Sequence, residues 1–365
     1  QPSTWTGGPL QQPRRTPWGL IILLSMIIAL AIDVGLWFGV GWFVRNYPQN
    51  WLTRWLPATS TTTIVQTPNE RTVTIAAPAA VTTVSASSLA IHQSRGQGGT
   101  YPDVASSGVS WALSSSGWSV TVAGALPSDA GQLIVLSDPG QPQAVVSTVK
   151  DPATPFVFLK TAELSVQPIS LAPASDNLLN ASVWVVGHSV SVLRQVTAHG
   201  GTDWSSSDHQ GDWWQLDTPV AVPAGSLVTD TEGRAIGLLD SQSRLWTLDT
   251  ITPILRQLIQ QSTIERPALR ANGLWREQAV VEGLTSATGL LIGAPAGQAA
   301  VEPKGPADKA GLRAGDVIIS VNGEEIRSDF FRTVAAYRPG EKVTVVVQRG
   351  QQQKTLTVTF GSLTP

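Results

Sequence analysis

The sequence predicts a mainly β protein that follows one N-terminal membrane-spanning helix and ends in a smaller α+β domain. Three features of the 365 residues support this prediction. A long apolar run lies near the N-terminus, short strands broken by Gly and Pro fill the middle, and two short helices interrupt the strands of the last region. The formal net charge is −2, which argues against the basic surface of a nucleic-acid-binding protein.

Residues 18–45 are predicted to form a transmembrane helix. The run that begins at Trp18 contains one ionisable residue, Asp33, and is long enough to cross the roughly 30 Å hydrocarbon core of a bilayer. Trp18 and Trp42 stand near its two ends, where indole rings favour the headgroup layer. A cleaved signal peptide is the alternative, because two arginines precede the run and an Ala-Leu-Ala sequence within it resembles a cleavage site.

Three residues inside the run have a second interpretation. Asp33 is costly in hydrocarbon, so it marks either a contact with another helix or the edge of the headgroup region. Gly35 and Gly39 form a small-xxx-small pair, which lets a second helix approach closely. These features favour assembly with other membrane proteins.

The remaining chain divides by composition. Residues 1–17 are rich in Pro, Gly, Gln and Thr and predict a disordered tail. Residues 46–87 predict a juxtamembrane segment and a stalk. Short strands indicate an all-β domain over 88–262, which ends in an amphipathic helix over 252–261. The last domain is placed at 266–362.

The last region carries a dense series of motifs, including an Asn-Gly pair that favours a tight hairpin turn. The motifs are Pro306-Ala307, Ala310-Gly311-Leu312, Gly315-Asp316-Val317-Ile318, Val321-Asn322-Gly323 and Arg338-Pro339-Gly340. Their order resembles a PDZ domain of the bacterial HtrA type. The resemblance implies a module that binds extended C-terminal peptides by adding a strand beside its sheet.

The peptide-binding loop of such a domain falls on four residues of this chain, Ala268, Leu269, Arg270 and Ala271. The family has glycine at the position of Arg270, because the backbone must approach the ligand closely there. Arg270 therefore either blocks the loop or pairs with a ligand carboxylate.

The order of anchor, stalk, all-β domain, helix and PDZ domain resembles that of membrane-anchored HtrA proteases. This resemblance implies a trypsin-like double β-barrel over 88–262. Three segments of the chain match the strands and loops that carry the family's catalytic residues: 109–124, 151–160 and 222–240.

The residues at the three catalytic positions lack the chemistry of a serine protease, which needs a hydroxyl nucleophile, an imidazole base and an orienting carboxylate. The resemblance places Gly124 at the histidine position, Pro155 at the aspartate position and Ala224 at the serine position. Ser226, two residues further on, is the fallback nucleophile. The sequence therefore predicts an HtrA-like pseudoprotease, which is not an enzyme.

A cluster of acidic residues and one histidine lies in the polar sequence SSSDHQGDWW, with Asp208, His209 and Asp212 among its members. We interpret it as a solvated loop between strands rather than as a metal site. The chain has no cysteine and only four histidines, so we expect neither a metal nor a cofactor.

The predicted function is that of a membrane-tethered scaffold, adaptor or subunit of a membrane protein complex. The expected location is a bacterial inner or plasma membrane, with one span and the bulk of the chain extracytoplasmic (periplasmic). Expected partners are other membrane or extracytoplasmic proteins, C-terminal peptides and further copies of the chain. Two alternatives remain open: an active HtrA-type serine endopeptidase with a rearranged site, and a PDZ-based sensor of exposed C-terminal peptides.

Overall fold

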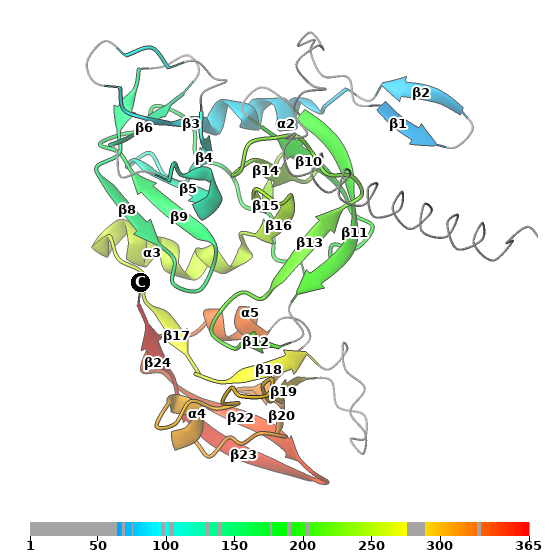
Figure 1. Ribbon diagram of the computed structural model, residues 1–365, viewed down its shortest axis with the longest axis vertical. Coiled ribbons are helices and arrows are strands. Elements are labelled where there is room, and N and C mark those ends of the chain that lie inside the picture. The colour runs from blue at the N-terminus through cyan, green and yellow to red at the C-terminus, as the bar shows by residue number, and fades with distance from the viewer. Residues whose placement is uncertain are drawn as a thin grey trace, which may run out of the picture. The chain divides into compact units, whose positions relative to one another are not determined.

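The residues described by the computed structural model belong to one compact unit, Thr61–Pro365 (Figure 1). They are 64–67, 70–74, 76–95, 99–101, 106–128, 132–137, 141–175, 177–187, 191–201, 204–275, 289–326 and 330–364. No helix within these ranges has the length and apolarity needed to cross a membrane. The predicted membrane residues lie outside the described residues: Trp18, Asp33, Gly35, Gly39 and Trp42.

The described part of the predicted stalk contains regular structure. Strand β1 (Ile64–Thr67) pairs with β2 (Glu70–Thr74) in a two-stranded sheet. Helix α2 (Ala79–Val84) and the 3-10 turn η3 (Ser85–Ser87) follow. Val81 of α2 is fully buried in the main hydrophobic core, so the last residues assigned to the stalk pack with the β domain.

The first half of the β domain is a seven-stranded antiparallel sheet in the order β7-β6-β3-β4-β5-β9-β8. Strand β5 continues into the 3-10 turn η5 (Ala123–Ala125). The strands are β3 (Ser88–Gln93), β4 (Gly108–Ala112), β5 (Trp118–Val122), β6 (Leu133–Leu136), β7 (Gln143–Ala144), β8 (Ser147–Lys150) and β9 (Phe156–Lys160).

The second half is a closed six-stranded barrel in the order β10-β11-β13-β16-β15-β14. Its strands are β10 (Ser182–Val186), β11 (Ser191–Gly201), β13 (Asp212–Leu216), β14 (Leu227–Thr229), β15 (Ala235–Leu239) and β16 (Arg244–Thr247).

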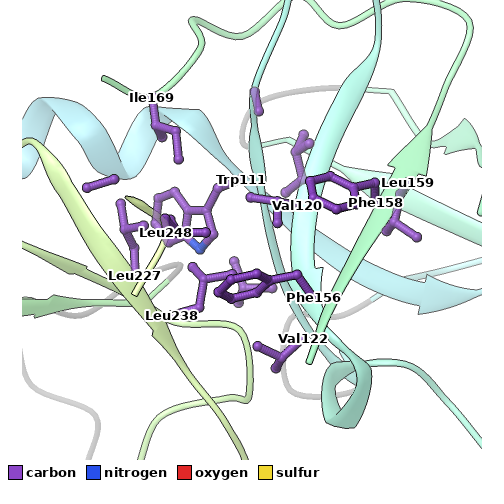
Figure 2. Close-up of a cluster of buried hydrophobic side chains, with 14 of the residues drawn as sticks. Trp111, Val120, Val122, Phe156, Phe158, Leu159, Ile169, Leu227, Leu238 and Leu248 are labelled. Atoms are coloured by element: carbon purple, nitrogen blue, oxygen red, sulfur yellow. The ribbon is translucent and has the colours of Figure 1, made fainter. Parts of the chain in front are cut away.

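The two halves share one hydrophobic core. Trp111 of the first half is fully buried beside Leu227 and Leu238 of the second (Figure 2). Its indole Nε1 donates a hydrogen bond to the carbonyl oxygen of Gly225 at 2.7 Å. Burying a large aromatic ring while satisfying its polar atom ties the two halves together.

The chain leaves the barrel through the 3-10 turn η6 (Asp249–Ile251) and the predicted helix, α3 (Thr252–Gln261). The bounds of α3 match the prediction. Ile254 and Leu258 are buried, whereas Ile259 is 48 % exposed, so the apolar stripe that packs on the core is narrower than the sequence suggested.

The last domain begins with β17 (Arg266–Ala268) and contains a sheet in the order β12-β18-β19-β20-β22-β23. Asn322 and Gly323 both have positive φ, as the predicted tight turn requires. Strand β12 (Ser205–Ser206) comes from the connection between β11 and β13. The other elements are β18 (Asn272–Trp275), β19 (Leu290–Ile292), α4 (Pro306–Lys309), β20 (Val317–Val321), β21 (Glu324–Glu325), α5 (Phe330–Ala335), β22 (Lys342–Arg349), β23 (Gln352–Thr359) and β24 (Gly361–Leu363).

A fully buried ion pair joins the last domain to the β domain. The Arg266 guanidinium donates to both carboxylate oxygens of Asp151, at 3.1 and 2.5 Å, and its third nitrogen donates to the carbonyl oxygen of Thr250. The same carboxylate accepts the amide of Ala153 and the hydroxyl of Thr154. These bonds satisfy the polar atoms that burial would otherwise leave without water.

Replacing Asp151 by alanine leaves Arg266 as a buried charge without a counter-charge. We expect Asp151→Ala to lower the free energy of unfolding by about 3–5 kcal/mol. Glu232, which pairs with Arg234 at 3.0 Å and is 67 % exposed, is the matched control, and Glu232→Ala should cost less than about 1 kcal/mol. Urea unfolding monitored by tryptophan fluorescence measures both free energies. Equal destabilisation by the two substitutions would contradict a structural role for the buried ion pair.

The turn that enters β14 needs glycine at position 225. Gly225 has φ +87°, and a Cβ there would lie 2.1 Å from the carbonyl oxygen of Val109. Gly297 has a similar φ of +89° with no atom within 4 Å of its Cβ position. We expect Gly297→Ala to cost about 1–2 kcal/mol from backbone strain alone, and Gly225→Ala to lower the thermal unfolding midpoint further. Equal unfolding midpoints for the Gly225→Ala and Gly297→Ala variants would show that the turn at Gly225 accommodates a Cβ without a steric cost.

Candidate functional site

The three predicted catalytic positions lie in segments that come together between the two halves of the β domain. Gly124 lies in η5, and the amide of its neighbour Ala123 donates to the carbonyl oxygen of Pro155 at 2.9 Å. A Cβ at Gly124 would lie 3.4 Å from the hydroxyl of Ser241, which follows β15 in the second half.

The predicted nucleophile loop is a tight turn before β14. The carbonyl oxygen of Ala224 accepts the amide of Val109 at 3.0 Å. Ser226 is fully buried, and its hydroxyl donates to the carbonyl oxygen of Pro223 at 2.7 Å. Among the described residues no hydrogen bond joins Ser226 to a histidine. The turn therefore holds the Ser226 hydroxyl against its own backbone, away from solvent.

The histidines are spread over the fold. His92 is buried on β3, edge-on to the ring of Tyr101. His199 lies 3.2 Å from the carboxylate of Asp212. Both His199 and His209 are exposed, and His188 lies outside the described residues. Within the described ranges no group of three or more His, Cys, Asp or Glu has the geometry of a metal site.

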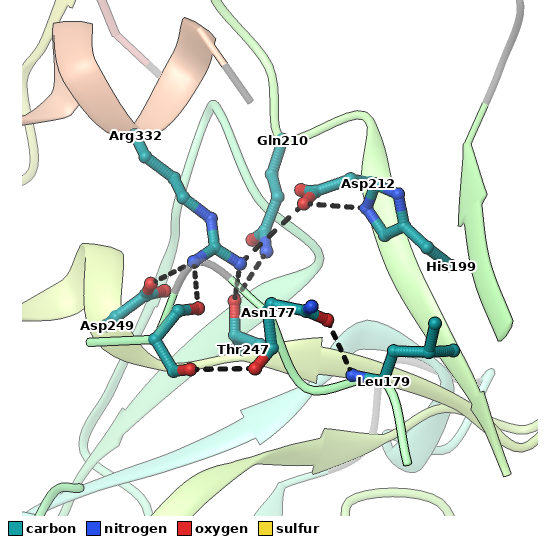
Figure 3. Close-up of polar contacts among 9 residues, drawn as sticks. Asn177, Leu179, His199, Gln210, Asp212, Thr247, Asp249 and Arg332 are labelled. Atoms are coloured by element: carbon teal, nitrogen blue, oxygen red, sulfur yellow. Dashed lines mark hydrogen bonds and ion pairs between the residues drawn. The ribbon is translucent and has the colours of Figure 1, made fainter. Parts of the chain in front are cut away.

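Arg332 of α5 connects the last domain to the closed barrel (Figure 3). Its guanidinium donates to Asp249 at 2.7 Å and to the hydroxyl of Thr247 at 3.1 Å, and it lies 3.6 Å from the Asp212 carboxylate. Gln210 donates to the same Thr247 hydroxyl. The loop between β11 and β13 is thus held against both domains.

The predicted peptide-binding residues Ala268 to Ala271 lie where β17 leads into β18. Arg270 has φ +60°, the left-handed conformation that favours the glycine found in the family. Its guanidinium pairs with Glu302 at 3.0 Å. The side chain therefore points to a partner within the same domain.

The carboxylate of Asp208 lies against the predicted peptide-binding loop of residues 268–271, a contact that the sequence did not predict. The amides of Leu269 and Arg270 donate to its carboxylate at 2.7 and 2.9 Å, and the amide of Ala271 donates to the hydroxyl of Ser207 at 3.2 Å. Asp208 is only 4 % exposed. Burial raises the pKa of Asp208, and the hydrogen bonds from Ser207, Leu269 and Arg270 act in the opposite direction.

The prediction of a solvated polar loop around Asp208 is therefore wrong. The sequence signal was present, since three serines precede the acid, but the partner amides lie about 60 residues further along the chain. An open cavity of about 420 Å³ adjoins the contact and is lined by Asp208, His209, Arg270 and Glu302 among others.

Known proteins resemble both domains. A family model described as "PDZ domain" matches residues 299–349. A probable periplasmic serine endoprotease DegP-like of Brucella suis is 26 % identical over 257 residues, which are 65 % of this chain and 49 % of the relative. A protein of the same name in Bartonella henselae is 29 % identical over 274 residues, 69 % of this chain and 52 % of the relative. The chain spans about half the length of these curated relatives.

Solved structures have the same fold. A structure described as "HtrA-type protease AlgW with tripeptide" covers 78 % of this chain and 97 % of its own, with a TM-score of 0.57 and 22 % identity. The structure of the same protease with a decapeptide gives a TM-score of 0.54 at 20 % identity and covers 78 % of this chain and 98 % of its own. These likenesses confirm the trypsin-like fold with a PDZ domain.

The prediction that the chain is not an enzyme is contradicted by the relatives, which are named serine endoproteases. The physical reason is that a catalytic triad is defined by geometry and roles rather than by sequence position. Gly124, Pro155 and Ala224 at the expected positions therefore do not exclude a rearranged site. The chain is similar in sequence to HtrA/DegP-type serine endoproteases and has their trypsin-like fold with a C-terminal PDZ domain.

Proposed function

We propose that this chain acts outside the cytoplasm as an HtrA-type serine endopeptidase with a rearranged site, and that its PDZ domain binds the C-terminal end of a polypeptide. One observation carries the proposal: relatives named periplasmic serine endoproteases align over about two thirds of the chain. We assign cleavage to residues 88–262 and peptide binding to 266–362. The apolar run at 18–45 supports a membrane tether.

The geometry of the peptide-binding loop supports carboxylate binding. The amides of Leu269 and Arg270 converge on one carboxylate, that of Asp208, at 2.7 and 2.9 Å. Two backbone donors on one anion form charge-assisted hydrogen bonds, which are stronger than neutral ones. The C-terminal carboxylate of a peptide presents the same chemistry.

Cleavage at Ser226 requires a change in the turn that holds it. The hydroxyl must leave the carbonyl oxygen of Pro223 and come within about 3 Å of a base. Trp111 of the shared core donates a hydrogen bond to the carbonyl oxygen of Gly225 in the same turn. Opening the turn therefore involves the core shared by the two halves of the β domain.

Fluorophosphonate labelling of the full chain, with casein cleavage in parallel, tests the site. We expect the wild type to be labelled, Ser226→Ala to lose labelling and cleavage, and Ser241→Ala to keep both, because Ser241 is a second serine near the predicted catalytic positions. Labelling that survives Ser226→Ala would place the nucleophile elsewhere. No labelling of the wild type would remove hydrolysis from the proposal and leave peptide binding.

Peptide binding has its own test. A fluorescein-labelled decapeptide with an apolar last residue and a free carboxylate should bind the full chain in a fluorescence anisotropy titration. Its C-terminally amidated form should bind about tenfold or more weakly, because it lacks the anion that the loop amides recognise. Equal affinity for the two forms would contradict recognition of the C-terminus.

A further inference from the structure

The outer edge of the PDZ sheet is already paired. Strand β18 binds β19 on one side and β12 on the other, with Ser205 opposite Gly273 and Ser206 opposite Asn272. In Figure 1, β12 lies along β18. Adding an extended strand to an exposed sheet edge is how PDZ domains take a peptide, and here a segment of the same chain supplies the strand.

The segment also presents a carboxylate at the place where a peptide would end. After Ser206, the amide of Ser207 donates to the carbonyl oxygen of Ala271 at 2.8 Å. The next residue, Asp208, then accepts the amides of Leu269 and Arg270. A strand that runs antiparallel to β18 and ends in an anion on the loop amides has both elements of a bound C-terminus.

Contacts beyond Asp208 hold the segment in place. The amide of Gln210 donates to the carbonyl oxygen of Ala153 at 2.8 Å, and its side chain donates to Thr247. Arg332 of α5 lies 3.6 Å from Asp212 at the start of β13 (Figure 3). The segment is thus fixed at its downstream end by both domains.

We propose that residues 205–208 are an internal ligand of the PDZ domain, and that a peptide with a free C-terminal carboxylate displaces them. This inference rests on the proposed peptide binding and adds its regulation. The same two amides and the same sheet edge serve either occupant, so the two exclude each other. The open cavity beside Asp208 and Arg270 gives an incoming carboxylate a route to the contact.

Removing the internal anion should favour the external one. We expect Asp208→Ala to tighten binding of the free-carboxylate decapeptide by about tenfold or more, because the internal segment loses its charge-assisted hydrogen bonds. Asp217→Ala is the matched control. Asp217 directly follows β13, the strand after the loop that carries Asp208, but its side chain is 40 % exposed and lies 3.9 Å from Arg194. Unchanged affinity in Asp208→Ala would overturn the proposal while leaving peptide binding intact.

A reversible crosslink tests displacement directly. The chain contains no cysteine, so Ser206→Cys with Asn272→Cys places one cysteine pair across two facing residues of β12 and β18. The oxidised form should lose peptide binding, and reduction should restore it. Binding of equal strength in the oxidised and reduced forms would show that the segment does not compete.

Hydrogen exchange separates failure of this inference from failure of the proposed function. The amides of Leu269 and Arg270 should exchange faster in Asp208→Ala than in the wild type or Asp217→Ala, without any peptide present. Faster exchange with no peptide binding in any variant would keep the internal contact but overturn peptide displacement and the proposed binding. Unchanged exchange would overturn the internal ligand itself.

Discussion

The buried ion pair of Asp151 and Arg266 is the constraint on which the arrangement of the two domains depends. Asp151 lies in the turn between β8 and β9, and Arg266 is the first residue of β17. A planar guanidinium that donates through two of its nitrogens to the two oxygens of one carboxylate fixes direction as well as distance. Because the loop proposed to bind peptides begins two residues later, the pair fixes that loop relative to the β domain, and Arg332 adds a second attachment on α5.

The loop between β11 and β13 then becomes a shared part of both domains. Asp208 binds the PDZ loop, Gln210 binds the turn after β8, and Asp212 begins a barrel strand. These residues are separated by one position each, so one short stretch of chain carries all three contacts. A change in pairing at the edge of the PDZ sheet would therefore occur only a few residues from the start of β13.

Local rules in the sequence predicted much of the fold. Asn322-Gly323 forms the expected turn because both residues accept positive φ. Apolar spacing alone predicted α3, and the structure shows that the helix ends with the C-cap residue Ser262, which is in the left-handed conformation. The site was predicted less well. Asp208 is buried by amides about 60 residues away, and no local pattern reports such a partner. The prediction that the chain is not an enzyme failed for a related reason. It inferred the absence of a catalytic site from single aligned positions, whereas a catalytic site is defined by the spatial arrangement of its residues.

The internal strand and the PDZ sheet that it pairs with belong to the same polypeptide chain, and this has a quantitative consequence. A tethered ligand acts at an effective concentration of order millimolar, whatever the amount of protein present. A free C-terminus must exceed that value, scaled by the ratio of the two intrinsic affinities, before it occupies half of the sites. If peptides displace the Ser205–Asp208 segment as proposed, the segment sets a concentration threshold: a scarce or weakly binding C-terminus leaves it in place, and only an abundant or tightly binding one displaces it.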